Sequence, residues 1–190
     1  MNVNAPELIL EMGECPGLLA RAQAGNDEAF DELMRIHERM VLRIALRILG
    51  CVEDAQDAAQ EVFLRLYRNL RIFAADAEIR PWLYRVTVNA CRDALRKRGR
   101  LTELSAEGLA HDGGAEERIA QEQQRALLAR ALERLPEKER AAIVLREYEE
   151  RDTAEVARIL NSTPTTVRTQ ISKGRAHLRD MIARLTRRKS

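Results

Sequence analysis

Residues 152–168, which read DTAEVARILNSTPTTVR, predict two short helices joined by a tight turn. Asp152 or Thr153 can cap the first helix, because a short oxygen-bearing side chain accepts hydrogen bonds from the free backbone N–H groups of a first turn. Asn161 tolerates the left-handed backbone with which helices often end. Thr163 can cap the second helix, and the proline after it fits the first turn. This stretch therefore indicates a helix-turn-helix.

The second helix of this motif is expected to bury one face and to expose a basic one. Val167 and Ile171 fall on the inward stripe, which Gly174 and Leu178 continue. The outward face offers hydroxyl groups and cations of the kind that reach base edges and phosphates in a major groove: Thr165, Arg168, Thr169, Ser172, Lys173 and Arg175. A plain helical hairpin with a solvated basic face is the alternative, but the turn spacing and the basic residues that follow favour DNA binding.

The rest of the chain also has helical patterning. Ala, Leu, Arg and Glu, which are good helix formers, dominate the 190 residues, and apolar residues recur at three- and four-residue spacing. The pattern predicts helices over about 18–24, 27–49, 54–70, 81–98, 116–134, 137–147, 153–160 and 164–185, and it predicts no strands. Asn26 or Asp27 can cap the second of these helices, and Gly50 can end it. We therefore expect an all-α fold.

A change in composition divides the chain into two small helical domains. Residues 101–115 contain three glycines and scattered acids without apolar periodicity, which is typical of a flexible linker. We expect a first domain over residues 18–100 and a second, containing the helix-turn-helix, over residues 116–190. Residues 1–17 form an N-terminal tail without a clear pattern.

The basic residues are concentrated in two blocks, although the whole chain carries a formal net charge of only +2. Residues 80–100 hold seven basic residues and one acid, a net +6, and residues 164–190 hold eight basic residues and one acid, a net +7. Two such blocks can be the footprint of a polyanion such as DNA, because Lys and Arg that neutralise phosphates release condensed counterions. Solvated helix faces would explain the charge alone equally well.

The first basic block places DNA-compatible side chains on one face of a helix. Four of them fall near one another at 3.6 residues per turn: Arg85, Asn89, Arg92 and Arg96. In the preceding loop, Phe73 can stack on an unpaired base. Core packing is the alternative for Phe73, and for Trp82 it is the interpretation that we favour.

An acidic stripe lies on the helix predicted over residues 54–70. Asp54, Asp57 and Glu61 are spaced i, i+3, i+7, opposite to the apolar stripe of the same helix. The helix dipole explains part of this pattern, because it favours acids near a helix N-terminus. A stripe this uniform can also dock a basic partner.

The cysteines and histidines do not indicate a metal, disulfide or catalytic site. The cysteines are odd in number without a CxxC pair, and the histidines are scattered: Cys15, Cys51, Cys91, His37, His111 and His177. We expect no cofactor, no metal and no enzymatic activity. An enzyme is the competing hypothesis that these residues do not favour. The chain has no signal-like start and no apolar run of about 20 residues, so we expect a cytoplasmic protein with reduced thiols and no membrane insertion.

These stretches together closely resemble the extracytoplasmic-function branch of the sigma-70 family of RNA polymerase sigma factors. Residues 54–67, DAQDAAQEVFLRLY, look like the family's helix for binding core polymerase. Residues 80–93, RPWLYRVTVNACRD, look like its promoter-melting helix. Residues 135–140, LPEKER, with IVLR at 143–146, look like the start of its fourth conserved region, and the helix-turn-helix follows at the expected distance. The resemblance covers about residues 18–185.

The resemblance implies a sigma factor that directs core RNA polymerase to specific promoter DNA. Core polymerase would bind Asp54, Asp57, Gln60 and Glu61 in a domain similar to the family's second region. The minus-ten element would be read and opened by Phe73, Arg80, Arg85, Asn89, Arg92 and Arg96. The minus-thirty-five element would be read by Thr165, Thr166, Arg168, Thr169, Ser172, Lys173 and Arg175. The resemblance also implies a separate anti-sigma factor wedged between the two domains.

An ordinary helix-turn-helix repressor or activator is the main alternative. It would explain residues 152–175, but neither the acidic stripe nor the second basic helix. One departure from the family pattern is Glu149-Glu150-Arg151-Asp152-Thr153, which stands where Gly-Leu-Ser-Tyr-Glu is commoner. We expect this change to alter helix capping and not function.

Overall fold

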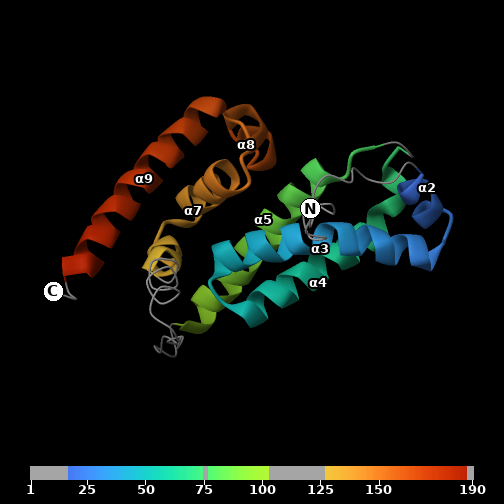
Figure 1. Cartoon of the computed structure of the whole chain (residues 1–190), viewed down its shortest axis with the longest axis horizontal. Helices are drawn as coiled ribbons and strands as arrows, with labels where there is room; N and C mark the ends of the chain where they lie inside the picture. The colour runs from blue at the N-terminus through green and yellow to red at the C-terminus, as the bar shows by residue number, and fades with distance from the viewer. Residues whose placement is uncertain (1–16, 75–76, 103–126, 188–190) are drawn as a thin grey trace, which may run out of the picture.

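The computed structural model describes residues 17–74, 77–102 and 127–187, and within these ranges all regular structure is helical (Figure 1). The elements are α2 (Leu18–Gln23), α3 (Asp27–Leu49), α4 (Val52–Asn69), a 3-10 turn (Leu70–Ile72), α5 (Arg80–Thr102), a helix over 127–133, α7 (Glu137–Ile143), a π-helical turn (Val144–Tyr148), α8 (Thr153–Ile159) and α9 (Pro164–Arg187). The expected all-α fold is confirmed. Nearly all of the expected tail, 1–17, and of the expected linker, 101–115, lies outside the described residues.

The two ends of α3 follow from local chemistry. The Asn26 side chain accepts a hydrogen bond from the backbone N–H of Ala29 at 2.7 Å, which makes Asn26 the N-cap. Gly50, with a φ of 74°, ends the helix in the left-handed conformation that glycine adopts without steric cost. The start and the end predicted for this helix are confirmed.

The first domain buries the apolar stripes of α3, α4 and α5 against one another, and α2 packs on α3. Its core contains side chains that are almost inaccessible to solvent: Leu33, Ile44, Ile48, Val62, Leu66, Ile79, Leu83 and Val88. Burying one such side chain contributes roughly 1.5–3 kcal/mol. The bundle thereby fixes the outer faces of α4 and α5, on which the predicted polymerase-binding and strand-binding residues lie.

The second domain packs α7 and α8 against the long helix α9. Val167 and Ile171 face inward, as the sequence predicts, and are 0% and 7% exposed. Gly174 marks the closest approach of two helices, because a Cβ atom there would lie only 2.9 Å from Cγ1 of Ile143. This contact holds one side of α9 against α7 and leaves the opposite side free.

The helix-turn-helix has the local contacts that its sequence predicts. The Asp152 carboxylate accepts a hydrogen bond from the N–H of Glu155 at 2.7 Å, and the Glu155 carboxylate accepts one from the N–H of Asp152 at 3.0 Å. Asn161 has a left-handed φ of 49°. Oγ1 of Thr163 accepts a hydrogen bond from the N–H of Thr166 at 3.1 Å. Both helix starts and the turn between them are therefore set by short-range interactions.

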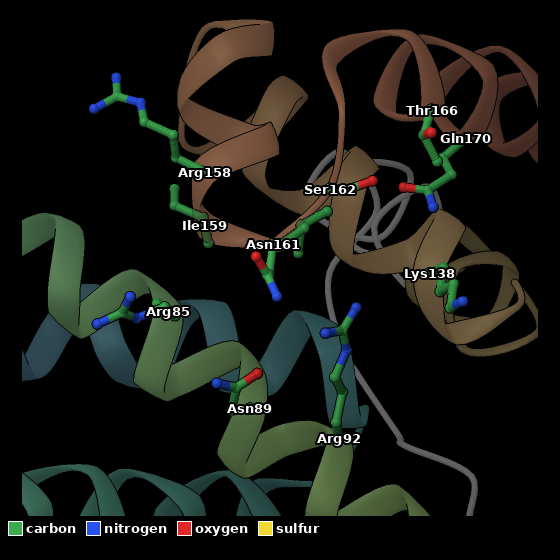
Figure 2. A pocket seen from close by; sticks show the side chains of 11 residues that line it. Arg85, Asn89, Arg92, Lys138, Arg158, Ile159, Asn161, Ser162, Thr166 and Gln170 are labelled. Carbon is green, nitrogen blue, oxygen red and sulfur yellow. The ribbon is translucent and has the colours of Figure 1, made fainter.

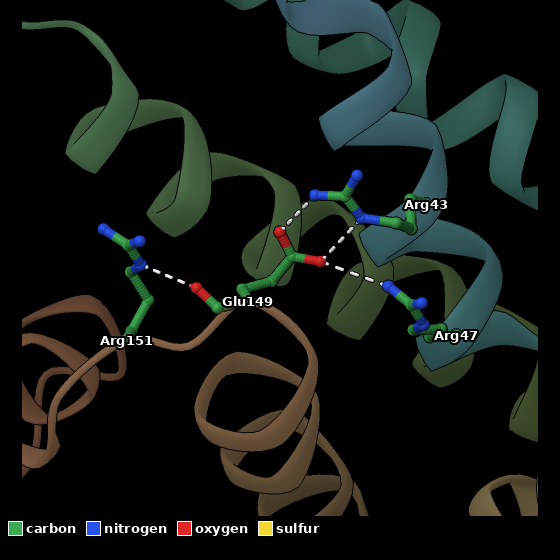
Figure 3. A network of polar contacts seen from close by, with 4 residues as sticks. All are labelled: Arg43, Arg47, Glu149 and Arg151. Carbon is green, nitrogen blue, oxygen red and sulfur yellow. Dashed lines mark hydrogen bonds and ion pairs between the residues drawn. The ribbon is translucent and has the colours of Figure 1, made fainter. Parts of the chain in front are cut away.

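One element differs from the prediction. The sequence predicts a regular helix over residues 137–147, but the α-helix ends at Ile143 and a π-helical turn continues to Tyr148. The backbone N–H of Glu149 bonds to the carbonyl of Val144, five residues back, at 3.2 Å. The wider turn buries Val144 in the second domain and leads the chain to Glu149, which points toward the first domain (Figure 3). Apolar periodicity does not distinguish α from π winding over a single turn.

The two domains contact each other directly. Helix α5 contacts α8, and α3 contacts both α7 and the π-helical turn. Figure 1 shows α7 and α8 beside the α3–α5 bundle, with α9 farther out. This placement, which the sequence does not predict, brings part of the basic face of α5 close to the start of α9.

Candidate nucleic-acid interface

The face of α9 that the sequence predicts for duplex DNA is open to solvent. All seven of its side chains are exposed: Thr165, Thr166, Arg168, Thr169, Ser172, Lys173 and Arg175. The helix begins at Pro164, so the first residues of this face lie in the first turn, the part of a recognition helix that contacts base edges. Arg175 pairs with Glu147 at 2.5 Å, and it must leave this carboxylate to reach a phosphate.

The basic face of α5 is partly open and partly engaged. Arg85, Asn89 and Arg96 are exposed on it. Arg92 is mostly buried, and its Nε lies 2.8 Å from a carboxylate oxygen of Glu137 in the second domain. The second domain therefore occupies one of the side chains that the sequence predicts for a DNA strand.

Phe73, the predicted base-stacking residue, is half-buried. Its ring meets the ring of Trp82 edge to face, with 5.4 Å between the ring centroids. Gln23 Nε2 donates hydrogen bonds to the carbonyl of Phe73 at 2.9 Å and to that of Leu70 at 2.8 Å. Both rings pack against the first-domain core, which agrees with the core packing favoured for Trp82. Arg80, the remaining predicted strand contact, is half-buried at the start of α5.

Two members of the acidic stripe on α4 are paired within the first domain. Oδ2 of Asp54 lies 3.5 Å from Nη1 of Arg98. The Glu61 carboxylate accepts a hydrogen bond from Nε of Arg65 at 2.7 Å. These two acids contribute part of their charge to local ion pairs, so the stripe is less uniform in the structure than in the sequence.

The remaining member of the stripe, Asp57, lies next to an exposed apolar surface. Asp57 and Gln60 are exposed, and Leu64 and Tyr67 follow them on the same face of α4 with 44% and 56% of their surface exposed. An exposed Leu and Tyr next to polar side chains are typical of a protein-binding surface. The two apolar residues were not predicted from the sequence, although their i, i+4 and i, i+7 spacing from Gln60 could have indicated them.

A cavity of about 590 Å³ lies where the two domains meet (Figure 2). Arg85, Asn89 and Arg92 of α5 line one side of it, and residues of α7, α8 and α9 line the other, among them Thr166. Residues predicted for two different DNA elements therefore share one space. The rest of the α9 face, including Arg168 and Lys173, is not part of this lining.

A buried carboxylate joins the two domains (Figure 3). Glu149 is 5% exposed, and it accepts hydrogen bonds from Nε of Arg43 at 2.9 Å, from Nη2 of Arg43 at 2.6 Å and from Nη1 of Arg47 at 3.2 Å. A two-point contact between a guanidinium and a carboxylate is among the strongest polar contacts in proteins. We call Arg43, Arg47 and Glu149 the interdomain clasp.

The two arginines of the clasp differ in their electrostatic environment. The hydrogen bond with Glu149 raises the pKa of Arg43, because it stabilises the charged guanidinium. Burial lowers the pKa of Arg47 although Glu149 acts in the opposite direction. The guanidinium of Arg47 also lies over the ring of Tyr148, 4.3 Å from its centroid. Arg43 is therefore the main electrostatic partner of Glu149.

Arg140 forms a second link between the domains. Its guanidinium donates hydrogen bonds to the carbonyl of Ile48 in α3 and to the carbonyls of Glu133 and Leu135 in its own domain. Burial lowers the pKa of Arg140. Nothing in the spacing of the sequence indicates that this arginine has backbone partners 92 residues away.

The expectation that the Glu149–Thr153 departure alters helix capping is confirmed at Asp152, and Glu149 has a further contact that the sequence did not predict. Asp152 caps α8, whereas the Glu149 carboxylate accepts its hydrogen bonds from Arg43 and Arg47 of α3. Glu149 and Asp152 are close in the sequence, but Asp152 bonds within the second domain and Glu149 bonds to the first.

Metal and membrane sites are not found among the residues that the structure describes. No group of three or more His, Cys, Asp or Glu side chains in the described ranges could hold a metal ion. No helix in those ranges is long and apolar enough to span a membrane.

Comparisons with known families match both domains. A family model described as Sigma-70 region 2 matches residues 33–101, and one described as Sigma-70, region 4 matches residues 125–178. The first match contains α4 and nearly all of α5, and the second contains the helix-turn-helix with the greater part of α9.

Curated proteins from several bacteria are similar over most of the chain. The ECF RNA polymerase sigma factor SigM of Mycobacterium tuberculosis is 35% identical over 168 residues, covering 88% of this chain and 84% of that protein. The ECF RNA polymerase sigma-E factor of Escherichia coli is 32% identical over 184 residues, covering 90% of this chain and 95% of that protein. The ECF sigma factor SigW of Bacillus subtilis is 29% identical, covering 86% and 94%.

Two solved structures share the fold. CnrH in complex with the cytosolic domain of CnrY aligns with a TM-score of 0.66 and 25% identity, covering 87% of this chain and 95% of that one. The sigma factor RpoE of Bartonella quintana, solved with the anti-sigma factor NepR, aligns with a TM-score of 0.64 and 18% identity, covering 81% and 96%.

Proposed function

This chain belongs to the extracytoplasmic-function branch of the sigma-70 family, and on this basis we propose that it directs core RNA polymerase to specific promoters and initiates transcription there. The observation that carries the proposal is the order of the two matches: a region 2 domain is followed by a region 4 domain with an exposed, hydroxyl-rich and basic helix. A repressor with only a helix-turn-helix has no use for the first domain.

The second domain is proposed to read the minus-thirty-five element through α9. The exposed face from Thr165 to Arg175 supports this assignment, because its hydroxyl groups and cations can bond to base edges and phosphates in a major groove. Arg168 and Lys173 are its central cations. Gly174 supports the geometry by keeping the opposite side of α9 against α7.

The first domain is proposed to capture one strand of the minus-ten element. Arg85, Asn89, Arg92 and Arg96 on α5 would hold the phosphates and bases of the separated strand, and Phe73 with Arg80 would lie beside an unpaired base. Unstacking a base costs a few kcal/mol, which stacking and phosphate contacts offset. Melting is then driven by capture of the open strand.

Core polymerase is proposed to bind the outer face of α4. Asp57 and Gln60 carry the polar part of this surface, and Asp54 and Glu61 flank it. Leu64 and Tyr67 extend it with apolar area, whose burial would stabilise the complex. This combination suits a partner that is basic with an apolar centre.

Promoter binding then requires the two domains to separate. The names minus ten and minus thirty-five place the two elements about 25 base pairs apart, which is about 85 Å at 3.4 Å per base pair. Arg85, Asn89 and Thr166 line one cavity of about 590 Å³, so they cannot lie on both elements at once in this arrangement. The structure is therefore assigned to a closed form, which polymerase and DNA would open.

A separate anti-sigma factor is proposed to hold the chain inactive. Support comes from the two solved relatives of the same fold, which are complexes of CnrH with the cytosolic domain of CnrY and of RpoE with the anti-sigma factor NepR. We also propose that the chain acts in the cytoplasm without catalysis of its own, since its relatives are sigma factors. A pull-down from native cells that recovers an inhibitor in addition to polymerase would support the proposed anti-sigma factor. Recovery of polymerase alone under every condition would count against an anti-sigma factor.

Run-off transcription with core polymerase on a promoter library tests the function. Wild-type chain is expected to yield promoter-specific transcripts, and the R168A/K173A variant is expected to lose at least about tenfold, since each good base contact is worth about 1–3 kcal/mol. The matched control is R130A/R134A, which removes two exposed cations of the second domain that lie outside α9 and outside the proposed contacts. Wild-type chain that confers no promoter-specific initiation would overturn the proposal.

Co-purification with core polymerase tests the α4 surface separately. D57A and L64A are expected to weaken retention on immobilised core enzyme. E38A is the control, because Glu38 is an exposed carboxylate on α3, outside the proposed surface. Equal retention of all three variants would remove polymerase binding from this face.

A further inference from the structure

The interdomain cavity gathers cations without a direct ion-pair partner among the described residues, although Arg85 and Arg158 also line a neighbouring pocket with Glu78 and Glu155. Arg85 of α5, Lys138 of α7 and Arg158 of α8 all line it, and no described residue forms an ion pair with any of the three. Arg92 is the exception, because it is paired with Glu137. No Asp or Glu side chain is part of the cavity lining.

These cations line the cavity from both domains, and in Figure 2 the guanidinium of Arg158 points away from Arg92 and Asn161. In Figure 2, Arg92 and Asn161 point into the cavity from opposite domains, and Lys138 and Arg158 stand at its opposite sides. Bringing like charges together opposes closure of the domains, because water and salt screen their repulsion only partly in a recess between two domain surfaces. The closed form therefore gains stability from any anion that occupies the cavity.

We propose that this cavity binds a small anion with several phosphate groups, which bridges the two domains and stabilises the closed form. The volume of about 590 Å³ lies in the usual range for small-molecule sites. Several phosphates match the set of separated cations better than one phosphate does, because guanidinium and ammonium groups on both sides can each pair with a different oxygen. The inference goes beyond the proposed function and needs neither polymerase nor promoter.

Neutral donors complete the lining. Asn161 and Ser162 lie in the turn of the helix-turn-helix, and Thr166 and Gln170 lie on the first turns of α9. Their amide and hydroxyl groups can donate to phosphate oxygens beside the cations. The backbone N–H groups at the start of α9 add partial positive charge on the same side.

Lys138 and Arg158 separate this site from the promoter contacts. Neither belongs to the residues proposed for the minus-ten or the minus-thirty-five element, and both are exposed, so they can be replaced without disturbing the core. An anion in the cavity would nevertheless exclude DNA from Asn89 and Thr166, which line it too. Occupancy would thereby couple the level of a phosphorylated small molecule to promoter access.

The test titrates the full chain with inorganic tripolyphosphate by calorimetry, with sodium chloride added to keep the ionic strength constant. Wild-type chain is expected to bind one equivalent with a dissociation constant below about 1 mM. The K138A/R158A variant is expected to bind at least about tenfold more weakly, because it lacks two of the charge-assisted contacts to the phosphates. The charge-matched control R68A/R179A removes two exposed cations outside the cavity and is expected to bind within about twofold of wild type.

A second readout reports bridging of the domains. Fluorophores are attached to cysteines introduced at Gln56 of α4 and Asp180 of α9, both exposed, after Cys15 and Cys51 have been changed to Ser. Tripolyphosphate is expected to raise energy transfer in wild type and not in K138A/R158A. Circular dichroism melting of each variant verifies that it is folded.

Three results would overturn the proposal: no binding by wild type, equal weakening in both double variants, or binding without a change in energy transfer. An ATP arm distinguishes the source of the phosphates, because tighter binding of ATP than of tripolyphosphate assigns the site to a nucleotide and the reverse assigns it to an inorganic polyphosphate. Run-off transcription by the same wild-type preparation is scored separately. Its failure would refute the sigma-factor function and leave the anion site standing.

Discussion

Replacing Glu149 with Gln is expected to loosen the closed form of the chain. The substitution keeps the size of the side chain but removes the charge that holds Arg43 and Arg47. It leaves two guanidinium groups facing a neutral amide at the domain interface. The contacts within the second domain are not affected, since the Glu149 side chain bonds to α3 alone among the described elements.

The structure sets the size of this effect. Removing one partner of a fully buried ion pair costs about 3–5 kcal/mol. The side chains of Arg43 and Arg47 are 41% and 29% exposed, however, so water screens the unpaired charges and the loss falls to about 1–2 kcal/mol. A change of that size shifts the ratio of closed to open chains by a factor of about 5–30.

Energy transfer between labels at positions 56 and 180 measures this ratio. E149Q is expected to lower the transfer at low salt and to reduce its dependence on salt. Glu150 supplies the matched control, because it is the exposed neighbour of Glu149 and E150Q removes the same charge from the surface. In a double-mutant cycle, R43Q and E149Q should be coupled by about 1–2 kcal/mol. Identical transfer in E149Q and E150Q, with no coupling to R43Q, would refute the reasoning.

Three further changes test the fold around the two domains. Gly174→Ala places a Cβ atom 2.9 Å from Ile143, and it should destabilise the second domain by about 1–3 kcal/mol, measured as a lower melting temperature. Asp152→Ala removes the cap of α8, which should cost about 1 kcal/mol in a urea titration, whereas Asp152→Asn should retain most of it. Cys91 is fully buried, and burial raises the pKa of its thiol from 9.0 to about 12, so iodoacetamide at pH 8 should modify Cys51 and spare Cys91 in mass spectra of the folded chain. Because the unfolded thiol ionises first, the stability that the neutral Cys91 contributes is complete below pH 9 and should be lost as the pH rises from 9 toward about 12; Cys91→Ala should abolish that part of the pH dependence.

The helices of each domain could be predicted because their signals are local. The ends of α3 depend on Asn26 and Gly50, which act within a few residues of their own positions. Asp152 and Asn161 set the helix-turn-helix in the same way. Side-chain capping and left-handed backbone are properties of short segments, so they can be read from sequence.

The relation between the domains could not be predicted in that way. Arg43 and Glu149 are 106 residues apart, and each is an ordinary charged residue in its own helix or turn. Their pairing depends on how the π-helical turn directs residue 149, and on α3 lying next to that turn. The sequence therefore indicated two domains but not the face on which they meet.

The sequence predicts which residues belong to the candidate site, but not the ion pairs that these residues form within the chain. The exposed face of α9 agrees with the pattern of its sequence. Arg92, Arg175 and Asp54 are predicted to bind DNA or polymerase, yet each forms an ion pair with an oppositely charged side chain of this chain. Counting charges along a helix does not reveal such internal pairing, because the partners come from other elements.

The clasp has a consequence for how such a chain can evolve. Glu149 lies outside every residue set that is proposed to touch polymerase or promoter, yet its carboxylate bonds the second domain to Arg43 and Arg47 of the first. A single substitution there would raise the background output of the regulon while leaving the choice of target genes unchanged. Selection can thus adjust the sensitivity of the response and its specificity as independent traits.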